Sequence, residues 1–249
     1  MGARGRIVMA LVAGCLTAGL WAQEPTEKPA EKPAETPEKK IIELPGLRLD
    51  REKRVLDVEA TVIRREGDWL ELLACTPGTR EHEAILTVTA RPSHINLALI
   101  MMGLEPGSPM KTVMVDGKYH AVPPRGPLVA VWLVVTDEKG QQKEVPANEW
   151  IFDRDTQKPM QGNHWMFTGS TMYEHEGQQI FLADVNGTVL SLVQFGDDLL
   201  ARDTELTSRS DGEILAANTQ AIPPVGTKVL IRMRPVEEKQ RDAEKEKKE

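Results

Sequence analysis

Short stretches in which apolar and polar residues alternate occupy much of the chain between residues 41 and 236. Alternation with a period of two is typical of β-strands that bury one face. Residues 47–49 and 55–62 alternate on either side of the charged turn Asp50–Arg54, and they predict a β-hairpin. Four further segments of similar character also predict strands: residues 69–74, 85–89, 129–135 and 229–233.

A second hairpin is predicted around the dipeptide Asn186-Gly187. Residues 181–185 and 188–192 flank it with strand-like sequence, and both residues of the dipeptide suit the positive φ angles of a type I′ turn. With Thr188 the dipeptide also matches a glycosylation acceptor, but a turn explains these residues without a sugar.

Residues 92–103 predict a helix. Ser93 can cap its start and Gly103 can end it. Its apolar residues cover most of the circumference, so we expect a sheet to bury it on more than one side. Together these elements predict an α+β fold: a strand-dominated single domain at residues 41–236 with one buried helix near 93–103.

The N-terminus has the pattern of a secretory signal peptide, which we place at residues 1–22. Arg4 and Arg6 precede an uncharged apolar run at 7–21, and this run is short for a membrane span. The sequence before Cys15 also resembles a lipobox, which would make this cysteine a lipid anchor. The longer apolar run favours a product without lipid, and both routes predict export to the periplasm or cell envelope.

Polar segments flank the expected domain. Residues 23–40 are rich in Pro, Glu and Lys, and they predict a disordered linker; residues 237–249 predict a charged, disordered tail. The formal net charge of the chain is -7, and the charges outside residues 41–236 cancel. An acidic domain argues against a nucleic-acid partner, which would require a basic surface. An envelope protein remains the expected partner, and the membrane would be reached only through Cys15.

The densest polar segment lies between two predicted strands and provides the candidate ligand-binding residues. These are Cys75, Arg80, His82 and Glu83, with His94 at the start of the predicted helix. A thiol beside a histidine can act as a nucleophile if the imidazole takes its proton. The alternative, which the residue types favour, is a buried cysteine at the end of a strand and a histidine with a local structural role.

Metal binding is a weaker possibility. None of the five histidines has the H-x-x-x-H or H-E-x-x-H spacing of a zinc site. Met110, Met160 and Met166 could bind a soft ion such as Cu(I), although methionine more often fills gaps in a core. The sequence therefore identifies no metal ligand and no cofactor.

Several segments of the chain resemble the YdjY-domain family of bacterial exported proteins. They read LELLACTPGTREHEAILTV, RPSHINLALIMMGLEPGSP, EWIFDRDTQKPM, HWMFTGS and IPPVGTKVLI, and they cover most of residues 47–236. The positions that match the motifs are Arg80, His82, Glu83, His94, Gly103, Pro106, Gly107, Trp165, Gly169 and Ser170. The resemblance implies an envelope protein and assigns no catalytic role to these positions.

Two classes of function therefore remain open. The first, which we favour, is a noncatalytic exported envelope module that binds a partner or a small ligand. The second is a metal-dependent or cysteine-dependent enzyme that uses the region of Cys75, His82 and His94.

Overall fold

The computed structural model describes residues 40–137, 139–202, 204 and 215–236. The expected signal peptide and charged tail lie outside these ranges, as does the expected linker apart from Lys40.

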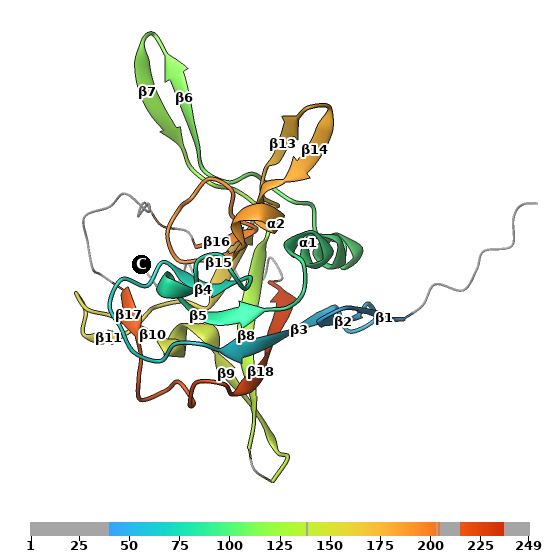
Figure 1. The fold of residues 1–249 in the computed structure, drawn as a ribbon, viewed down its shortest axis with the longest axis vertical. Helices are drawn as coiled ribbons and strands as arrows, with labels where there is room; N and C mark the ends of the chain where they lie inside the picture. Colours follow the sequence, from blue (N-terminus) through green and yellow to red (C-terminus); the bar gives the residue numbers. More distant parts are fainter. Residues whose placement is uncertain (1–39, 138, 203, 205–214, 237–249) are drawn as a thin grey trace, which may run out of the picture. The chain divides into compact units, whose positions relative to one another are not determined.

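Eight strands form a closed barrel (Figure 1). Around the ring they are β3 (Val55–Val62), β18 (Lys228–Pro235), β8 (Leu128–Thr136), β12 (His164–Phe167), β16 (Leu200–Ala201), β15 (Thr188–Ser191), β4 (Leu72–Cys75) and β5 (Ala84–Val88). β5 pairs with β3 and so completes the ring. The pairs β15–β16 and β4–β5 are parallel, and the other pairs of the ring are antiparallel. The strand-dominated fold is confirmed, whereas the closure of the sheet was not predicted.

Further strands extend this sheet or lie beside it. The predicted hairpin around Asp50–Arg54 is confirmed, because β2 (Leu47–Asp50) pairs antiparallel with β3. The remaining members of the sheet are β1 (Ile41–Leu44), next to β2, and β9 (Gln142–Pro146), next to β8. A separate sheet contains β10 (Ile151–Asp153), β11 (Lys158–Pro159) and β17 (Leu215–Ala217), and the 3₁₀ helix η2 (Ala147–Trp150) precedes β10.

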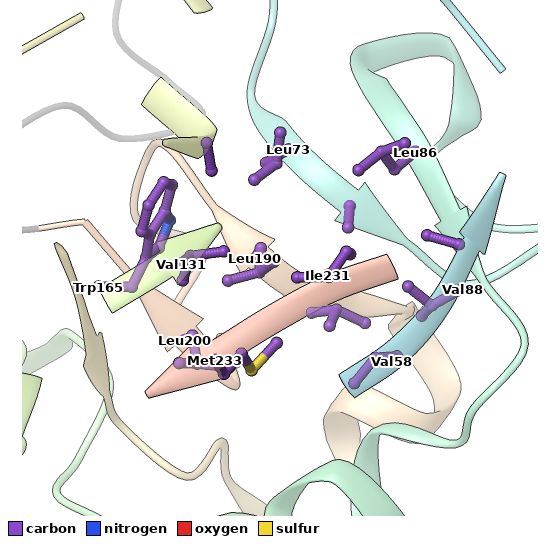
Figure 2. Packing of buried hydrophobic residues seen from close by; sticks show 14 of the residues in the cluster. Val58, Leu73, Leu86, Val88, Val131, Trp165, Leu190, Leu200, Ile231 and Met233 are labelled. Carbon is purple, nitrogen blue, oxygen red and sulfur yellow. The ribbon is translucent and has the colours of Figure 1, made fainter. Parts of the chain in front are cut away.

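The barrel interior is filled with apolar side chains. Figure 2 labels residues from all eight ring strands that point into one cluster: Val58, Leu73, Leu86, Val88, Val131, Trp165, Leu190, Leu200, Ile231 and Met233. All ten are fully buried. Trp165 also satisfies its indole N–H by donating to the carbonyl of Ser191 at 3.2 Å. The alternation in β3, β8 and β18 arises from this packing, because one face of each strand contributes to the core.

The predicted helix is α1 (Pro92–Met101), and its expected burial is only partly correct. Leu99 is fully buried, but Leu97 and Ile100 are 46% and 41% exposed, so one side of the helix faces solvent. The helix was expected to be covered on more than one side because its apolar residues lie all round it. No helix in the described ranges is long and apolar enough to cross a membrane.

The predicted Asn186-Gly187 hairpin is wrong. The residues before the turn form the helix α2 (Leu182–Asn186), and Gly187 ends it in the left-handed conformation with φ 73°. A helix C-terminus and a type I′ turn both require positive φ, so the dipeptide alone does not distinguish them. The following strand is present as β15, which pairs with β4 and β16.

Helix α2 also provides the cap that Ser93 was expected to supply. Asp184 accepts hydrogen bonds from the Ser93 N–H and hydroxyl, both at 2.7 Å, and from Arg91 at 2.8 Å. Ser93 is therefore a donor and does not accept a bond at the helix start. A carboxylate at this end of α1 also interacts favourably with the helix dipole.

Candidate functional site

The loop between β4 and β5, residues 76–83, carries most of the residues that the sequence marks as a site. It ends in the 3₁₀ helix η1 (Glu81–Glu83). The loop packs closely on Gly187: the Thr76 N–H donates to the Gly187 carbonyl, and a Cβ at Gly187 would lie 2.2 Å from the Thr79 hydroxyl. A side chain at Gly187 would clash with Thr79, so the glycine allows the loop to pack against the end of α2.

Three of the predicted site residues lie together at the end of this loop. Arg80 donates to Glu83 across 3.0 Å, and the His82 Nε2 lies 3.6 Å from the other oxygen of Glu83. The side chain of Glu83 is only 13% exposed, whereas that of His82 is 75% exposed. The Arg80 guanidinium also lies over the ring of Phe195, 4.2 Å from its centroid.

Glu71, directly before β4, completes this cluster. The register of β4 and β5 sets Leu72 opposite Ala84, and the Glu71 N–H donates to the Glu83 carbonyl at 3.1 Å. Burial raises the pKa of Glu71 to about 7, and the nearby charge of Glu83 and a hydrogen bond between the two carboxyl groups act in the same direction, against Arg80. Such a bond needs one proton, so the pair can hold and release a proton near neutral pH. We call Glu71, Arg80, Glu83 and Phe195 the carboxyl-pair cluster.

Cys75 lies at the end of β4 and is fully buried, as the sequence favours. Burial raises the pKa of its thiol to about 11; the charges of Glu81 and Glu83 add to this, and hydrogen bonds from Thr79 and the Arg80 backbone oppose it. A thiol with this pKa is almost entirely protonated at neutral pH and is a weak nucleophile. Among the described residues, no hydrogen bond or ion pair joins Cys75 to a histidine.

His94 is not part of this group. It lies in the first turn of α1, a helix that packs against α2 and β3, and its N–H donates to the Arg91 carbonyl. Its Nδ1 is buried and has no hydrogen-bond partner within the described ranges. The structure therefore brings Arg80, His82 and Glu83 together, with Cys75 buried behind them, and places His94 on a separate element.

A buried aspartate holds Phe195 in place over Arg80. The carboxyl group of Asp198 accepts the N–H groups of Phe195 and Gly196, at 3.2 Å and 2.9 Å. Burial raises the pKa of Asp198 to about 6, although the hydrogen bonds from these backbone groups lower it. Phe195 in turn packs on the small cluster formed by Leu72, Cys75 and Ala84. Asp198 thus holds Phe195 where its ring covers Cys75.

A second candidate surface consists of two hairpins that extend from the barrel on the same side (Figure 1). β6 (Lys111–Val115) pairs with β7 (Lys118–Val122), and β13 (Met172–His175) pairs with β14 (Gln178–Phe181). Their turns, Asp116-Gly117 and Glu176-Gly177, have positive φ at both residues, as a type I′ turn requires. We call the residues 111–122 and 172–181 the arm surface.

The arm surface is apolar and uncovered. Every residue of β6, β7 and β13 is exposed. Of the twelve exposed large apolar residues in the described part of the chain, the arms carry seven: Val113, Met114, Val115, Tyr119, Val122, Met172 and Tyr173. The arm bases meet at Gly196, where Thr171 donates to the Gly196 carbonyl and a Cβ on Gly196 would lie 3.3 Å from the Met110 carbonyl.

Comparison with family models identifies the fold that carries these two surfaces. The model of the YdjY domain matches residues 47–234. The chain belongs to the YdjY-domain family. The resemblance of its segments to this family is therefore confirmed. Comparisons with curated proteins and with solved structures gave no match.

Several positions of the YdjY pattern have a structural explanation. A Cβ on Gly107 would lie 1.8 Å from the Arg125 carbonyl, and one on Gly169 would lie 2.4 Å from Pro106. The hydroxyl of Ser170 donates to the carbonyl of Asp197 at 2.6 Å. These residues allow close packing, whereas Arg80, His82 and Glu83 reach the surface of the YdjY domain and are not explained by packing alone.

Metal ligands are not grouped in the described residues, where no three His, Cys, Asp or Glu side chains could hold an ion together. Of the methionines suggested for a soft metal, Met160 and Met166 are buried at 7% and 8% exposure. Met160 belongs to the main apolar core, the role that methionine usually has.

Sequence reasoning missed Glu71, Phe195, Asp198 and both arms. An acidic residue inside the apolar run from Trp69 to Ala74 is the signal that could have identified Glu71. An Asp-Gly dipeptide between alternating residues is among the strongest hairpin signals, and it is present at Asp116-Gly117.

Proposed function

We propose that this YdjY-domain protein is a noncatalytic, exported module of the cell envelope, and that it binds a protein partner through the arm surface. The observation that supports this most is the concentration of uncovered apolar side chains on two hairpins that pack on little else. Exposed apolar side chains gathered in this way are typical of interaction sites.

The arms also have a physical reason to be covered. A two-stranded hairpin with both faces in water is only marginally stable. Covering a side chain such as Met114 or Tyr119 contributes about 1.5–3 kcal/mol per fully buried residue before the losses of association are subtracted. The free edges of β6, β7, β13 and β14 add unpaired backbone groups that a partner can pair with.

The alternative, a cysteine-dependent or metal-dependent enzyme, receives less support. Its nucleophile would be a buried thiol with a pKa of about 11, and its two histidines would lie on different elements. The carboxyl-pair cluster can exchange a proton near neutral pH, but the thiol behind it, Cys75, is buried and protonated there.

The binding proposal can be tested in cells that produce the protein. A photo-crosslinking amino acid at Met114 or Tyr173 should yield a discrete adduct. The same amino acid at Val225, which is 59% exposed on a loop away from the arms, should not. Equal labelling at all three positions, or none at Met114 and Tyr173, would contradict a binding role for the arm surface.

Export is the second part of the proposal, and it rests on the charged and apolar pattern of residues 1–22. Cell fractionation should recover the protein outside the cytoplasm, and the mass of the purified chain should correspond to a start near Gln23 without an acyl group. A diacylglyceryl mass on Cys15 would replace the lipid-free product with a lipoprotein. Recovery in the cytoplasm at full length would refute export.

A further inference from the structure

The two arms carry opposite charge. The arm of residues 111–122 contains Lys111 and Lys118 against a single acidic residue, Asp116, a formal net charge of +1. The arm of residues 172–181 contains Glu174 and Glu176 and no lysine or arginine, a formal net charge of −2. We call them the basic arm and the acidic arm.

These charges are not paired with each other inside the chain. Glu174 accepts a hydrogen bond from the side-chain amide of Gln179, in its own hairpin, at 3.3 Å. No hydrogen bond or ion pair in the described ranges connects the basic arm to the acidic arm. Both arms therefore present their charge, with their apolar side chains, to whatever covers them.

We infer that the partner of the arm surface is a second copy of this chain, with the basic arm of each copy packed against the acidic arm of the other. This rests on the proposed binding function and names its partner. The arm bases meet at Gly196 and both arms extend on one side of the barrel (Figure 1). Under two-fold symmetry, a contact of the basic arm with the acidic arm of the other copy occurs twice. Such an interface is self-complementary and closes at two copies.

One face of each arm carries charges together with apolar side chains. The register places Val113, Val115 and Val122 on the same face of the basic arm as Lys111 and Lys118, and Met172 on the same face of the acidic arm as Glu174. The arms comprise 22 residues of each copy (111–122 and 172–181), and about half of them can meet one partner because side chains alternate between the two faces. This is fewer than the about 20–30 residues that each side of a standard interface uses, so the expected dimer is a weak one.

The test uses charge reversal on the protein as the cell processes it, with its molar mass measured by sedimentation over a range of concentrations. The wild type should form a dimer that weakens as salt is raised, because screening reduces the attraction between arms. The variant K111E/K118E makes both arms acidic, and E174K/E176K makes both basic. Each should weaken the dimer by about tenfold or more, since attraction becomes repulsion in both contacts.

Mixing the two variants gives the sharpest result. Each copy then meets a copy of opposite charge at both arms, so the mixture should form a heterodimer although neither variant dimerises well alone. Circular dichroism provides the control that both variants keep the strand content of the wild type. A wild type that stays monomeric at 100 μM protein (about 10⁻⁴ M, a weak affinity for a specific dimer), or a mixture that stays monomeric, would overturn the inference.

Failure of this inference can be told apart from failure of the binding function. A crosslink with twice the mass of the chain, from Met114 or from Val113 on the same face as the lysines, supports a second copy. A discrete adduct of another mass, with a monomeric purified protein, retains the arm surface as a binding site and rejects the second copy. An absence of any adduct rejects both.

Discussion

Replacing Glu71 by glutamine tests the carboxyl pair directly. Glutamine has the shape of a protonated glutamate and keeps a donor toward Glu83, but it cannot ionise. The pKa of Glu71 is raised from 4.5 to about 7 in the folded chain. The folded state therefore keeps a proton that the unfolded chain loses first, and the stability that this proton provides is full below pH 4.5 and is lost as pH rises to about 7.

The magnitude follows from the size of the shift. A fully buried group would change stability by about 1.4 kcal/mol for each pKa unit. Glu71 is partly exposed, and solvent screening reduces this to about 1 kcal/mol in total. We expect Glu71→Gln to be as stable as the wild type at pH 5 and about 1 kcal/mol more stable at pH 8. Asp198 titrates in both proteins, so the difference between them isolates Glu71.

Urea unfolding followed by tryptophan fluorescence at pH 5 and pH 8 measures this difference. Glu66→Gln, the same chemical change at an exposed position, is the matched control and should leave the pH dependence as in the wild type. A Glu71→Gln protein that is less stable than the wild type at pH 8, or that loses as much stability between the two pH values, would refute the shared proton.

Four other substitutions test the packing. Asp184→Ala should lower the free energy of unfolding by about 2–3 kcal/mol, because it removes the cap of α1 and three hydrogen bonds. A thermal or denaturant titration measures this loss. A loss under about 0.5 kcal/mol, the size expected for an ordinary surface change, would argue against this cap. Leu99→Ala should cost about 2–5 kcal/mol and Leu97→Ala about 0.5 kcal/mol, since only Leu99 is fully buried; equal costs would mean that the exposure of α1 is misjudged. A thiol reagent should label Cys75 slowly in the folded protein. Labelling should be faster in Phe195→Ala, because this change removes the ring that covers the thiol. Rapid labelling of the wild type would instead indicate an accessible, activated thiol.

The strands of the barrel were predictable where one face of a long strand is buried. β3, β8 and β18 each have eight or nine residues, and their alternation is visible in the sequence. The closure of the ring could not be predicted from the sequence. It depends on the pairs β12–β16 and β15–β16, and β16 has only two residues. A strand of that length has no periodicity to read.

The candidate site also has a part that the sequence could predict and a part that it could not. Arg80, His82 and Glu83 are close in sequence, so a single loop brings them together and the sequence could group them. Glu71 reaches Glu83 only through the parallel register of β4 and β5, and that pairing is a property of the whole sheet.

The position of β18 between β3 and β8 has a consequence for how the chain folds as it is made. β18, the last strand in the described part of the chain, pairs with β3, and their partners Lys228 and Thr61 lie 167 residues apart in sequence. Until residues 228–235 emerge, β3 and β8 are neighbours that lack the strand between them, and each exposes an open edge. Open edges of this kind recruit strands from other molecules, so a nascent or truncated chain that lacks its final strand is the species most exposed to aggregation. The fold is thus secured only once the eight residues of β18 are available to pair with β3 and β8.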